Sequence, residues 1–242
     1  MDYYTTLEIL NRLDLEDIIK FNEVKTKYEN LFLGINEIIT PYWMTDEDLL
    51  QFKNLTHLDC QFNTNFTGKS LKQLTNLVEL RCDENKNFYD VHLTKLLKLR
   101  YLECGYNKNF TDESLSQLIN LTHLDCGWNK NFTDESLSQL INLTHLNCGF
   151  NRNFTDESLS KLTNLTYLNC ERTKNFTDNS LSKLTNLTYL NCRWNEMFTD
   201  DGLSKLTKLK ELHSVFNNFT NDKLRELTLN GCKLIIVLHD HE

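Results

Sequence analysis

Hydrophobic and polar positions recur along most of this chain with a fixed period of 22 residues. In each unit, apolar residues stand at positions one, four and six, a polar residue at nine, and apolar residues again at twelve, seventeen and twenty. One unit runs from Leu121 to Asn142, and the next, from Leu143 to Asn164, repeats it almost letter for letter. Such a period predicts an array of stacked units instead of one globular core.

The first half of each unit predicts a short strand. Leu124 and Cys126 are two residues apart, so both side chains point to one face, whereas His123 and Asp125 point to the other. One such strand cannot bury its apolar face alone. Neighbouring units that stack as a parallel sheet, with strands ~4.8 Å apart, turn these residues into continuous buried columns.

The second half of each unit predicts a short helix. Phe132 is followed by Thr133 and Asp134, and Thr is a good N-cap while acidic residues complement the positive end of a helix. A 22-residue unit leaves room for about two helical turns. The Phe column fills the space between strand and helix, and the Asn at position nine, Asn129 in this unit, satisfies backbone groups of the neighbouring turns.

The pattern L-x-x-L-x-C-x-x-N-x-x-F-T-D-x-x-L-x-x-L-x-N resembles the leucine-rich repeat, with Cys in the third leucine slot. The resemblance covers about residues 44–238. It implies an α/β repeat solenoid, a horseshoe or arc with a concave parallel sheet, short convex helical turns and a helical N-terminal cap. We expect the repeat domain to span residues 35–242, with a degenerate leading strand formed by Leu33, Ile35, Ile38 and Ile39 and a capping strand over Leu234, Ile236 and Leu238.

Residues 1–34 differ from the repeats and predict two or three short helices. The string that begins Glu8-Ile9-Leu10 and continues to Leu31 looks like the core of an F-box, the helical module that docks on the Skp1 adaptor of cullin ubiquitin ligases. That resemblance implies adaptor binding and a substrate bound by the repeats. The same spacing also suits a plain N-terminal cap packed on the first repeat. The candidate adaptor-binding residues are Leu10, Leu13, Ile18 and Phe21.

Composition and charge narrow the class further. With 40% hydrophobic residues and one Pro, the chain is neither disordered nor collagen-like. No apolar run is long enough to cross a bilayer, and the start Met1-Asp2-Tyr3-Tyr4 lacks the order of a secretion signal. We therefore expect an intracellular protein, cytoplasmic or nuclear, that is not secreted and has no membrane partner. The net charge of −8 argues against nucleic acid as a partner.

Seven of the eight cysteines, from Cys60 to Cys192, stand at intervals of 22 residues. Metal sites need ligands that converge on a point, whereas this spacing makes a line, so we expect buried reduced thiols and no metal or cofactor. His123 and His145 lie near Asp125, but no nucleophile, base and orienting group accompany them. We expect no catalytic residues and no enzymatic activity.

Function is expected in the outward positions that vary between units. Aromatic side chains gather there beside Gly105, Gly127 and Gly149, over which we expect an open surface, and such rows are typical of protein interfaces. Acidic residues near the N-terminal end of this face indicate a partner with a basic segment. The candidate partner-binding residues are Tyr101, Tyr106, His123, Trp128, His145, Phe150, Tyr167, Arg172, Tyr189, Trp194, Glu84 and Glu103.

A row of cations follows the position-nine Asn and offers a weaker alternative, the binding of anions or nucleic acid. The row consists of Lys86, Lys108, Lys130, Arg152 and Lys174. Five cations at strand spacing suit phosphate groups. The competing interpretation is that they neutralise the Asp row at the helix starts, which includes Asp112 and Asp134. The leading hypothesis is thus a protein-protein interaction module, and the alternative is a substrate receptor of a cullin-type ubiquitin ligase.

Overall fold

The computed structural model describes residues 36–40 and 42–236, in which ten strands of three residues each form one parallel sheet in chain order. The strands are β1 (Glu37–Ile39), β2 (His57–Asp59), β3 (Glu79–Arg81), β4 (Tyr101–Glu103), β5 (His123–Asp125), β6 (His145–Asn147), β7 (Tyr167–Asn169), β8 (Tyr189–Asn191), β9 (Glu211–His213) and β10 (Lys233–Ile235). The predicted parallel sheet is therefore confirmed.

Each strand pairs with the next in a register that aligns equivalent positions of successive units. Leu102, Leu124 and Leu146 are direct partners across β4, β5 and β6. The cysteines form a second buried column, in which the Cys126 thiol donates to the Asn147 carbonyl at 3.4 Å and all eight thiols are free. The 22-residue period thus becomes a set of columns in which each residue meets its equivalents.

The segments between strands contain short helices on the other side of the core. These are α3 (Asp46–Leu49), the 3₁₀ turn η2 (Leu71–Gln73), α4 (Asp90–Leu93), α5 (Asp112–Leu115), α6 (Asp134–Leu137), α7 (Asp156–Leu159), α8 (Asp178–Leu181), α9 (Asp200–Leu203) and α10 (Asn221–Leu229). The predicted Thr cap is present: the Thr133 hydroxyl accepts from the Glu135 amide at 3.2 Å.

The expected two turns of helix were wrong, because most of these helices span four residues, a single turn. After α5 the chain makes two tight turns: the Leu118 amide donates to the Leu115 carbonyl, and the Leu121 amide donates to the Leu118 carbonyl. These turns carry the chain back to the sheet. The length of the unit therefore limits the helix more strongly than its sequence does.

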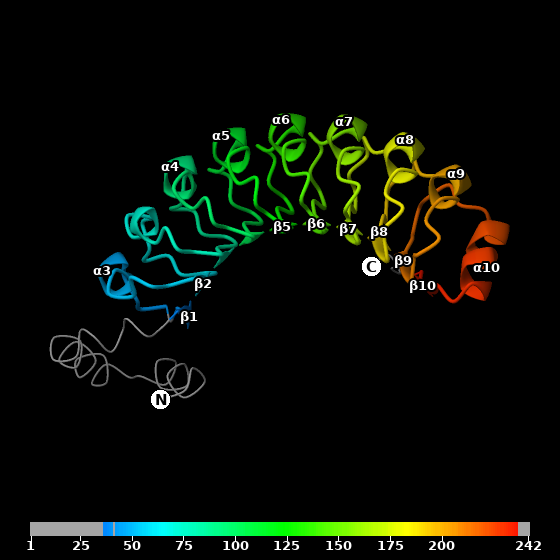
Figure 1. The fold of residues 1–242 in the computed structure, drawn as a ribbon. Helices are drawn as coiled ribbons and strands as arrows, with labels where there is room; N and C mark the ends of the chain where they lie inside the picture. Colours follow the sequence, from blue (N-terminus) through cyan, green and yellow to red (C-terminus); the bar gives the residue numbers. More distant parts are fainter. Residues whose placement is uncertain (1–35, 41, 237–242) are drawn as a thin grey trace, which may run out of the picture.

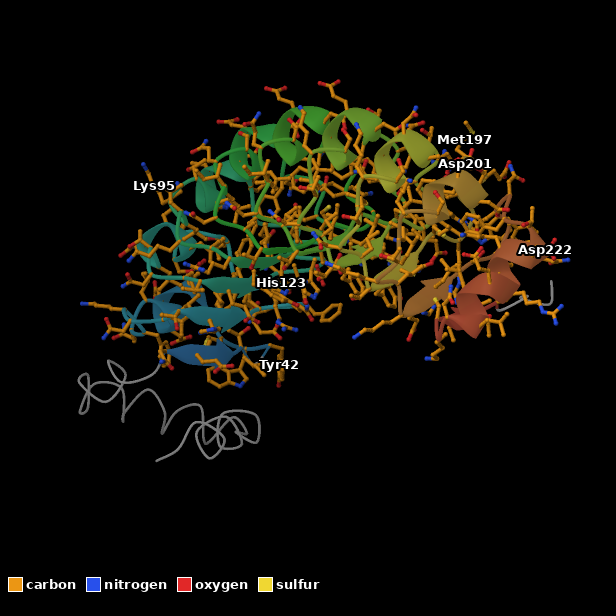
Figure 2. The ribbon with its side chains drawn as sticks, turned by 45° about the vertical axis from the view of Figure 1, so that its right-hand side comes forward. Tyr42, Lys95, His123, Met197, Asp201 and Asp222 are labelled. Carbon is orange, nitrogen blue, oxygen red and sulfur yellow. The ribbon has the colours of Figure 1, made fainter. Side chains whose placement is uncertain are left out.

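The described residues form an arc with the strands along the inner side and the helices along the outer side (Figure 1). Figure 2 places His123 at the inner side and Met197 and Asp201 on the helical side. Between the layers, the Leu, Cys and Phe columns are buried, with Phe132 at 0% exposure. The Asn column joins the units, since Asn129 Nδ2 donates to the Asn107 carbonyl at 2.8 Å.

An Asp row at the helix starts links each unit to the next. Asp112 Oδ1 accepts from the Thr133 amide at 2.9 Å, and its Oδ2 accepts from the Thr133 hydroxyl at 2.6 Å. The Ser136 hydroxyl also donates to Asp112. In the described part of the chain the hydrogen-bond partners of these carboxylates are Thr and Ser groups of the following unit, and no ion pair there joins them to the lysine row.

The ends of the array agree in part with the prediction. The leading strand is β1, in which Ile38 is buried and Ile39 is 41% exposed, whereas Leu33 and Ile35 lie outside the described residues. The final strand is β10, with Leu234 packed against the core. It ends at Ile235, so the predicted Ile236 lies beyond it and is 51% exposed. The helix α10 has nine residues and is longer than the other helices that the structure describes.

Some predictions fall on segments that the structure does not describe. The F-box-like or capping segment 1–34, with its candidate residues Leu10, Leu13, Ile18 and Phe21, lies outside the described residues, as does Leu238. Within residues 36–40 and 42–236, no helix is both long and apolar enough to span a membrane.

Candidate functional site

Two rows of rings run along the concave side, and the first stands at the start of the strands. We call Tyr101, His123, His145, Tyr167 and Tyr189 the inner ring row. The sheet register brings these positions side by side, and the ring centroids lie 5.4, 4.0, 5.8 and 4.2 Å apart in that order. The rings are nearly parallel, so the row is one continuous stack.

The second row stands just beyond the ends of the strands. We call it the rim row, and it consists of Phe62, Glu84, Tyr106, Trp128, Phe150, Arg172, Trp194 and Phe216. Trp128 stacks on Tyr106 at 5.5 Å and on Phe150 at 3.9 Å. The Arg172 guanidinium continues the stack, 5.2 Å from the Phe150 ring centroid and 4.8 Å from that of Trp194.

All eight rim-row residues adopt the left-handed backbone conformation, with φ between 56° and 62°. Glycine or asparagine is the usual choice there, and another residue costs roughly 1–2 kcal/mol. Six of the eight are nevertheless aromatic, and Tyr106 and Trp128 stay 49% and 38% exposed. The sequence did not reveal this conformation, because its usual signal, a Gly or Asn, is absent. Backbone geometry therefore does not explain the choice of aromatic residues.

Between the two rows, Asp and Asn side chains hold the chain where it leaves each strand. Asp125 Oδ1 accepts from the Gly127 amide at 3.1 Å, and Asn147 Oδ1 accepts from the Gly149 amide at 3.2 Å. These glycines are buried, and a Cβ on Gly105 would meet the Gly127 carbonyl oxygen at 3.3 Å. The expected open surface over the glycines was wrong. An Asp or Asn two residues earlier was the available signal for this turn.

Carboxylates gather at the N-terminal half of the face. Gln61 Nε2 donates to both Asp83 Oδ2 at 3.1 Å and Glu103 Oε2 at 2.8 Å. The pKa of Asp83 is raised to about 7, chiefly by burial and also by the charges of Asp125, Glu103 and Asp59, against the lowering effect of the hydrogen bond from the Gly105 amide. The predicted acidic bias of this half is thus a cluster of carboxylates close enough to hold a proton near neutral pH.

Arg81 neutralises part of the negative charge of these carboxylates. Its Nε lies 2.8 Å from Glu79 Oε1, and its Nη1 lies 3.5 Å from Glu103 Oε1. The same guanidinium lies 4.9 Å from the Tyr101 ring centroid. Glu84 lies on the rim and is exposed. The N-terminal half of the face therefore already holds one cation between carboxylates and a ring.

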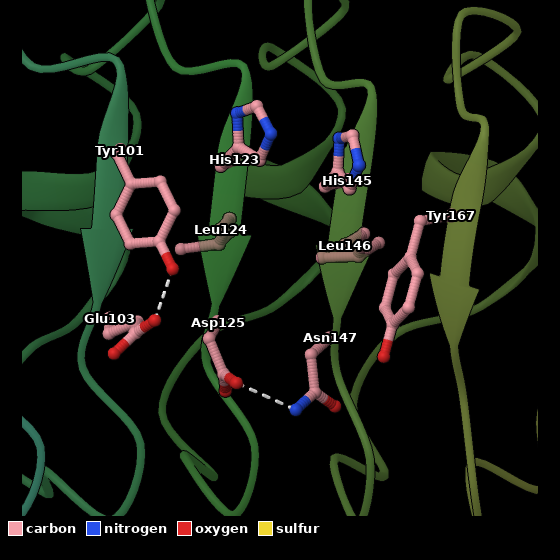
Figure 3. Close-up of a pocket in the computed structure, with 9 residues that line it drawn as sticks. All are labelled: Tyr101, Glu103, His123, Leu124, Asp125, His145, Leu146, Asn147 and Tyr167. Carbon is pink, nitrogen blue, oxygen red and sulfur yellow. Dashed lines mark hydrogen bonds between the residues drawn. The ribbon is translucent and has the colours of Figure 1, made fainter.

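A recess of about 220 Å³ lies in the middle of the face. The tyrosines Tyr101 and Tyr167 stand at its two sides, with the imidazoles of His123 and His145 along one border (Figure 3). Burial lowers the pKa of both histidines, and the charge of His123 lowers that of His145 further. The remaining lining residues are Glu103, Leu124, Asp125, Leu146 and Asn147.

All twelve predicted partner-binding residues lie on these two rows or beside them. The inner ring row and the rim row bring together the aromatic candidates, with Tyr189 and Trp194 toward the C-terminal end. Glu103 follows Tyr101 on β4, and the Tyr101 hydroxyl donates to it. Their contact with a partner stays a prediction, argued below.

The cation row lies next to the rim row. Each of its five residues is exposed, and none of them forms an ion pair within the described ranges. Their backbone carbonyls accept hydrogen bonds that join neighbouring units; for example, Asn131 Nδ2 donates to the Lys108 carbonyl.

Metal and thiol chemistry have little support among the described residues. No group of three or more His, Cys, Asp or Glu there is arranged to hold a metal ion. Burial raises the pKa of the Cys126 thiol well above its usual value, so it stays protonated and unreactive.

Comparison with known proteins identifies the fold. No protein-family model and no curated protein sequence matched the chain. Among solved structures, an internalin (InlF) from Listeria monocytogenes superposes with a TM-score of 0.66 at 20% identity, over 88% of this chain and 70% of that one. The functional domain of InlJ from the same organism, described as including a cysteine ladder, gives 0.60 at 28% identity. The chain has the leucine-rich repeat fold.

The predicted leucine-rich repeat solenoid is therefore confirmed. The match to InlJ covers 91% of this chain but only 50% of that one, so this chain spans half the length of that relative. A chain from the yeast complex of Rad7 and Elc1 also superposes, with a TM-score of 0.56 at 17% identity, over 92% of this chain and 76% of that one. In this leucine-rich repeat arc, the buried cysteine column corresponds to the slot of the third leucine.

Proposed function

We propose that this leucine-rich repeat protein is a non-catalytic interaction module that binds a protein partner on its concave face. The observation that carries the proposal is the rim row: exposed aromatic side chains at left-handed positions, where the fold alone favours Gly or Asn. Large rings with little conformational freedom are the side chains that dominate protein interfaces. The leucine-rich repeat neighbours among solved structures support a general protein-binding role.

The test replaces Tyr106 and Trp128 together by Asn, which tolerates the left-handed conformation. The double variant is expected to keep its fold and to lose partner affinity at least tenfold, because each lost aromatic anchor costs ~2 kcal/mol or more at a hot spot. A partner captured by the wild-type protein is purified and its affinity measured by calorimetry for both proteins.

A matched control removes apolar side chains of similar exposure elsewhere. Ile119 and Ile141 are each 54% exposed and lie outside both ring rows. Their replacement by Asn should leave affinity unchanged. If the Tyr106 and Trp128 variant binds as tightly as the control, the concave-face proposal fails.

The acidic half of the face favours a partner with a basic segment. Asp59, Asp83, Glu103 and Asp125 lie within one cluster, in which the like charges already raise the pKa of Asp83. A cationic segment relieves that repulsion. Binding should therefore weaken with rising salt, and a salt-independent affinity would remove the basic-segment proposal.

The ligase-receptor alternative rests on the F-box-like segment 1–34. Replacing Leu10 and Leu13 by Ser in the 242-residue chain should abolish capture of a Skp1-like adaptor if the segment is an F-box. If segment 1–34 is instead a cap packed on the first repeat, the same variant should lose thermal stability, and unchanged stability would count against that alternative. No capture by the wild-type chain eliminates the receptor proposal.

Two further expectations belong with this proposal. An intracellular location, cytoplasmic or nuclear, is supported by eight free thiols in one chain.

The exposed cation row supports anion binding as a weaker alternative. If the chain does not bind single-stranded nucleic acid at low salt, the anion-binding proposal fails.

A further inference from the structure

We propose that the recess between Tyr101 and Tyr167 is a subsite for one cationic side chain, an arginine or lysine of the partner's basic segment. This inference rests on the proposed function and deepens it, because it assigns the contact to one place on the concave face. The argument combines the shape of the recess, the direction of its hydrogen bonds and its charge.

The recess exists because two neighbouring units carry a shorter ring. Tyr101, His123, His145 and Tyr167 are equivalent positions on four adjacent strands. A tyrosine projects its phenol farther from the strand than a histidine projects its imidazole, so the two histidines leave a gap between the two phenols (Figure 3). Leu124 and Leu146 lie beneath it on the strands, with their side chains buried in the core. About 220 Å³ is enough space for one long side chain.

We assign the protons of the two imidazole rings from the hydrogen-bond network around them. The Thr122 hydroxyl donates its one proton to the Arg100 carbonyl at 3.1 Å and also lies 2.9 Å from His123 Nδ1. With the hydroxyl proton on the Arg100 carbonyl, the hydroxyl accepts from the ring, and we assign the ring proton to Nδ1 on that basis. In the neutral ring, Nε2 is then left as a bare acceptor.

His145 has the same arrangement. The Thr144 hydroxyl donates to the Thr122 carbonyl at 3.1 Å and lies 2.9 Å from His145 Nδ1. Because burial lowers the pKa of both histidines, both rings are neutral at pH 7. The border of the recess therefore presents two acceptor nitrogens.

The opposite border adds acceptors with negative charge. Asp125 accepts from the Gly127 amide and from Asn147 Nδ2, at 3.1 and 2.7 Å, which leaves lone pairs on both oxygens. Glu103 accepts from Gln61 and Tyr101, and its Oε1 also lies 3.5 Å from Arg81 Nη1, so the free lone pair that it retains is on Oε2. Bare acceptors and carboxylates together need donors with positive charge, which ammonium and guanidinium groups supply.

The aromatic sides complete the match. A cation is attracted to the face of a tyrosine ring. The face already shows this contact, because the Arg81 guanidinium lies 4.9 Å from the Tyr101 ring centroid on the side of β3. On the side of β5, His123 stacks on Tyr101 with ring centroids 5.4 Å apart, so a partner's cation in the recess would meet the hydroxyl end of the Tyr101 ring, which reaches past the imidazole (Figure 3).

The probe is N-acetyl-arginine amide, which has one charge and neutral ends, titrated into the full chain while ring signals of His123 and His145 are followed by NMR. Its uncharged isostere, N-acetyl-citrulline amide, is the matched ligand. We expect saturable shifts with arginine and at least tenfold weaker binding with citrulline. Equal binding of the two compounds overturns the proposal.

Two variants use residues that neighbouring units already carry. The first variant, Asp125→Asn, introduces the Asn that stands at the equivalent positions 147, 169 and 191. The second combines His123→Tyr with His145→Tyr and fills the gap with the Tyr that stands at the equivalent position 167. Both should fold and weaken arginine binding at least tenfold; in the double Tyr variant, which lacks the two imidazoles, binding is followed on the ring signals of Tyr101 and Tyr167. Glu135→Gln removes the same charge from an exposed helical position and should change nothing.

The outcomes separate this inference from the proposed function. Undiminished arginine binding in the filled double Tyr variant refutes the subsite, whatever the partner does. Loss of arginine binding there, together with unchanged partner affinity in the Tyr106 and Trp128 variant, supports the subsite and refutes the rim row as the main interface.

Discussion

At the scale of single residues, each aromatic side chain of the rim row combines a strained left-handed backbone with stacking on its neighbours. Trp128 has a φ of 62° and stacks on two neighbours. The sequence predicted that this side chain faces outward, from its place beyond the strand. It could not predict the conformation, because left-handed geometry at a non-Gly residue leaves no compositional trace.

Replacing Trp128 by Gly should therefore change the free energy of unfolding by less than ~1 kcal/mol. Relief of left-handed strain, about 1 kcal/mol, offsets the loss of stacking of similar size. Urea unfolding measures the difference. Trp128→Val, a β-branched residue at the same φ, should be clearly less stable than Trp128→Gly, and equal stability of the two would show that strain is absent.

The Asp83 carboxyl gives a second prediction at this scale. Its pKa in the folded chain, about 7, exceeds its ordinary value of 3.8. The folded state therefore binds the proton more readily, so wild-type stability falls as pH rises from about 4 through 7. Asp83→Asn should be more stable than wild type by about 1–2 kcal/mol at pH 8, after allowance for partial exposure, and equal to it at pH 4. Unfolding curves at both pH values test this; a constant difference contradicts it.

At the scale of elements, each one-turn helix depends on the unit before it. A four-residue helix has almost no intrinsic stability. Asp134 binds the Thr155 amide and hydroxyl, at 2.9 and 2.6 Å, and thereby holds the start of α7. The sequence identified Thr and Asp as capping residues. It missed that the Asp serves the next unit, because that contact spans 21 residues.

Asp134→Ala should destabilise the chain by about 2–4 kcal/mol, because it leaves two Thr donors and the Ser158 hydroxyl without a charged acceptor. Glu135→Ala, one residue later and exposed, is the control and should cost less than ~0.5 kcal/mol. Thermal unfolding measures both. A similar loss in the two variants would mean that the Asp row does not join the units.

At the scale of the whole molecule, the 22-residue period was enough to predict the columns, the parallel sheet and the arc. Equivalent residues of neighbouring units lie side by side in the sheet, so the pattern of one unit predicts the structure of nearly all the units. The outward columns also predicted the acidic bias of the N-terminal half, but the recess and the contacts within the carboxylate cluster were not predictable in this way. They arise where units differ, at His123 and His145 between tyrosines and at Asp83 beside Gln61, and their geometry depends on side-chain length and pairing.

The central claim is that a protein partner covers the concave face. Hydroxyl-radical footprinting of the full chain, with and without its partner, tests it most directly. Binding should reduce the oxidation of Tyr106 and Trp128 severalfold. The internal references are Met197, 53% exposed on the helical side, and Tyr42, 82% exposed, whose oxidation should not change. Protection of Met197 with unchanged oxidation of Tyr106 and Trp128 would contradict the account.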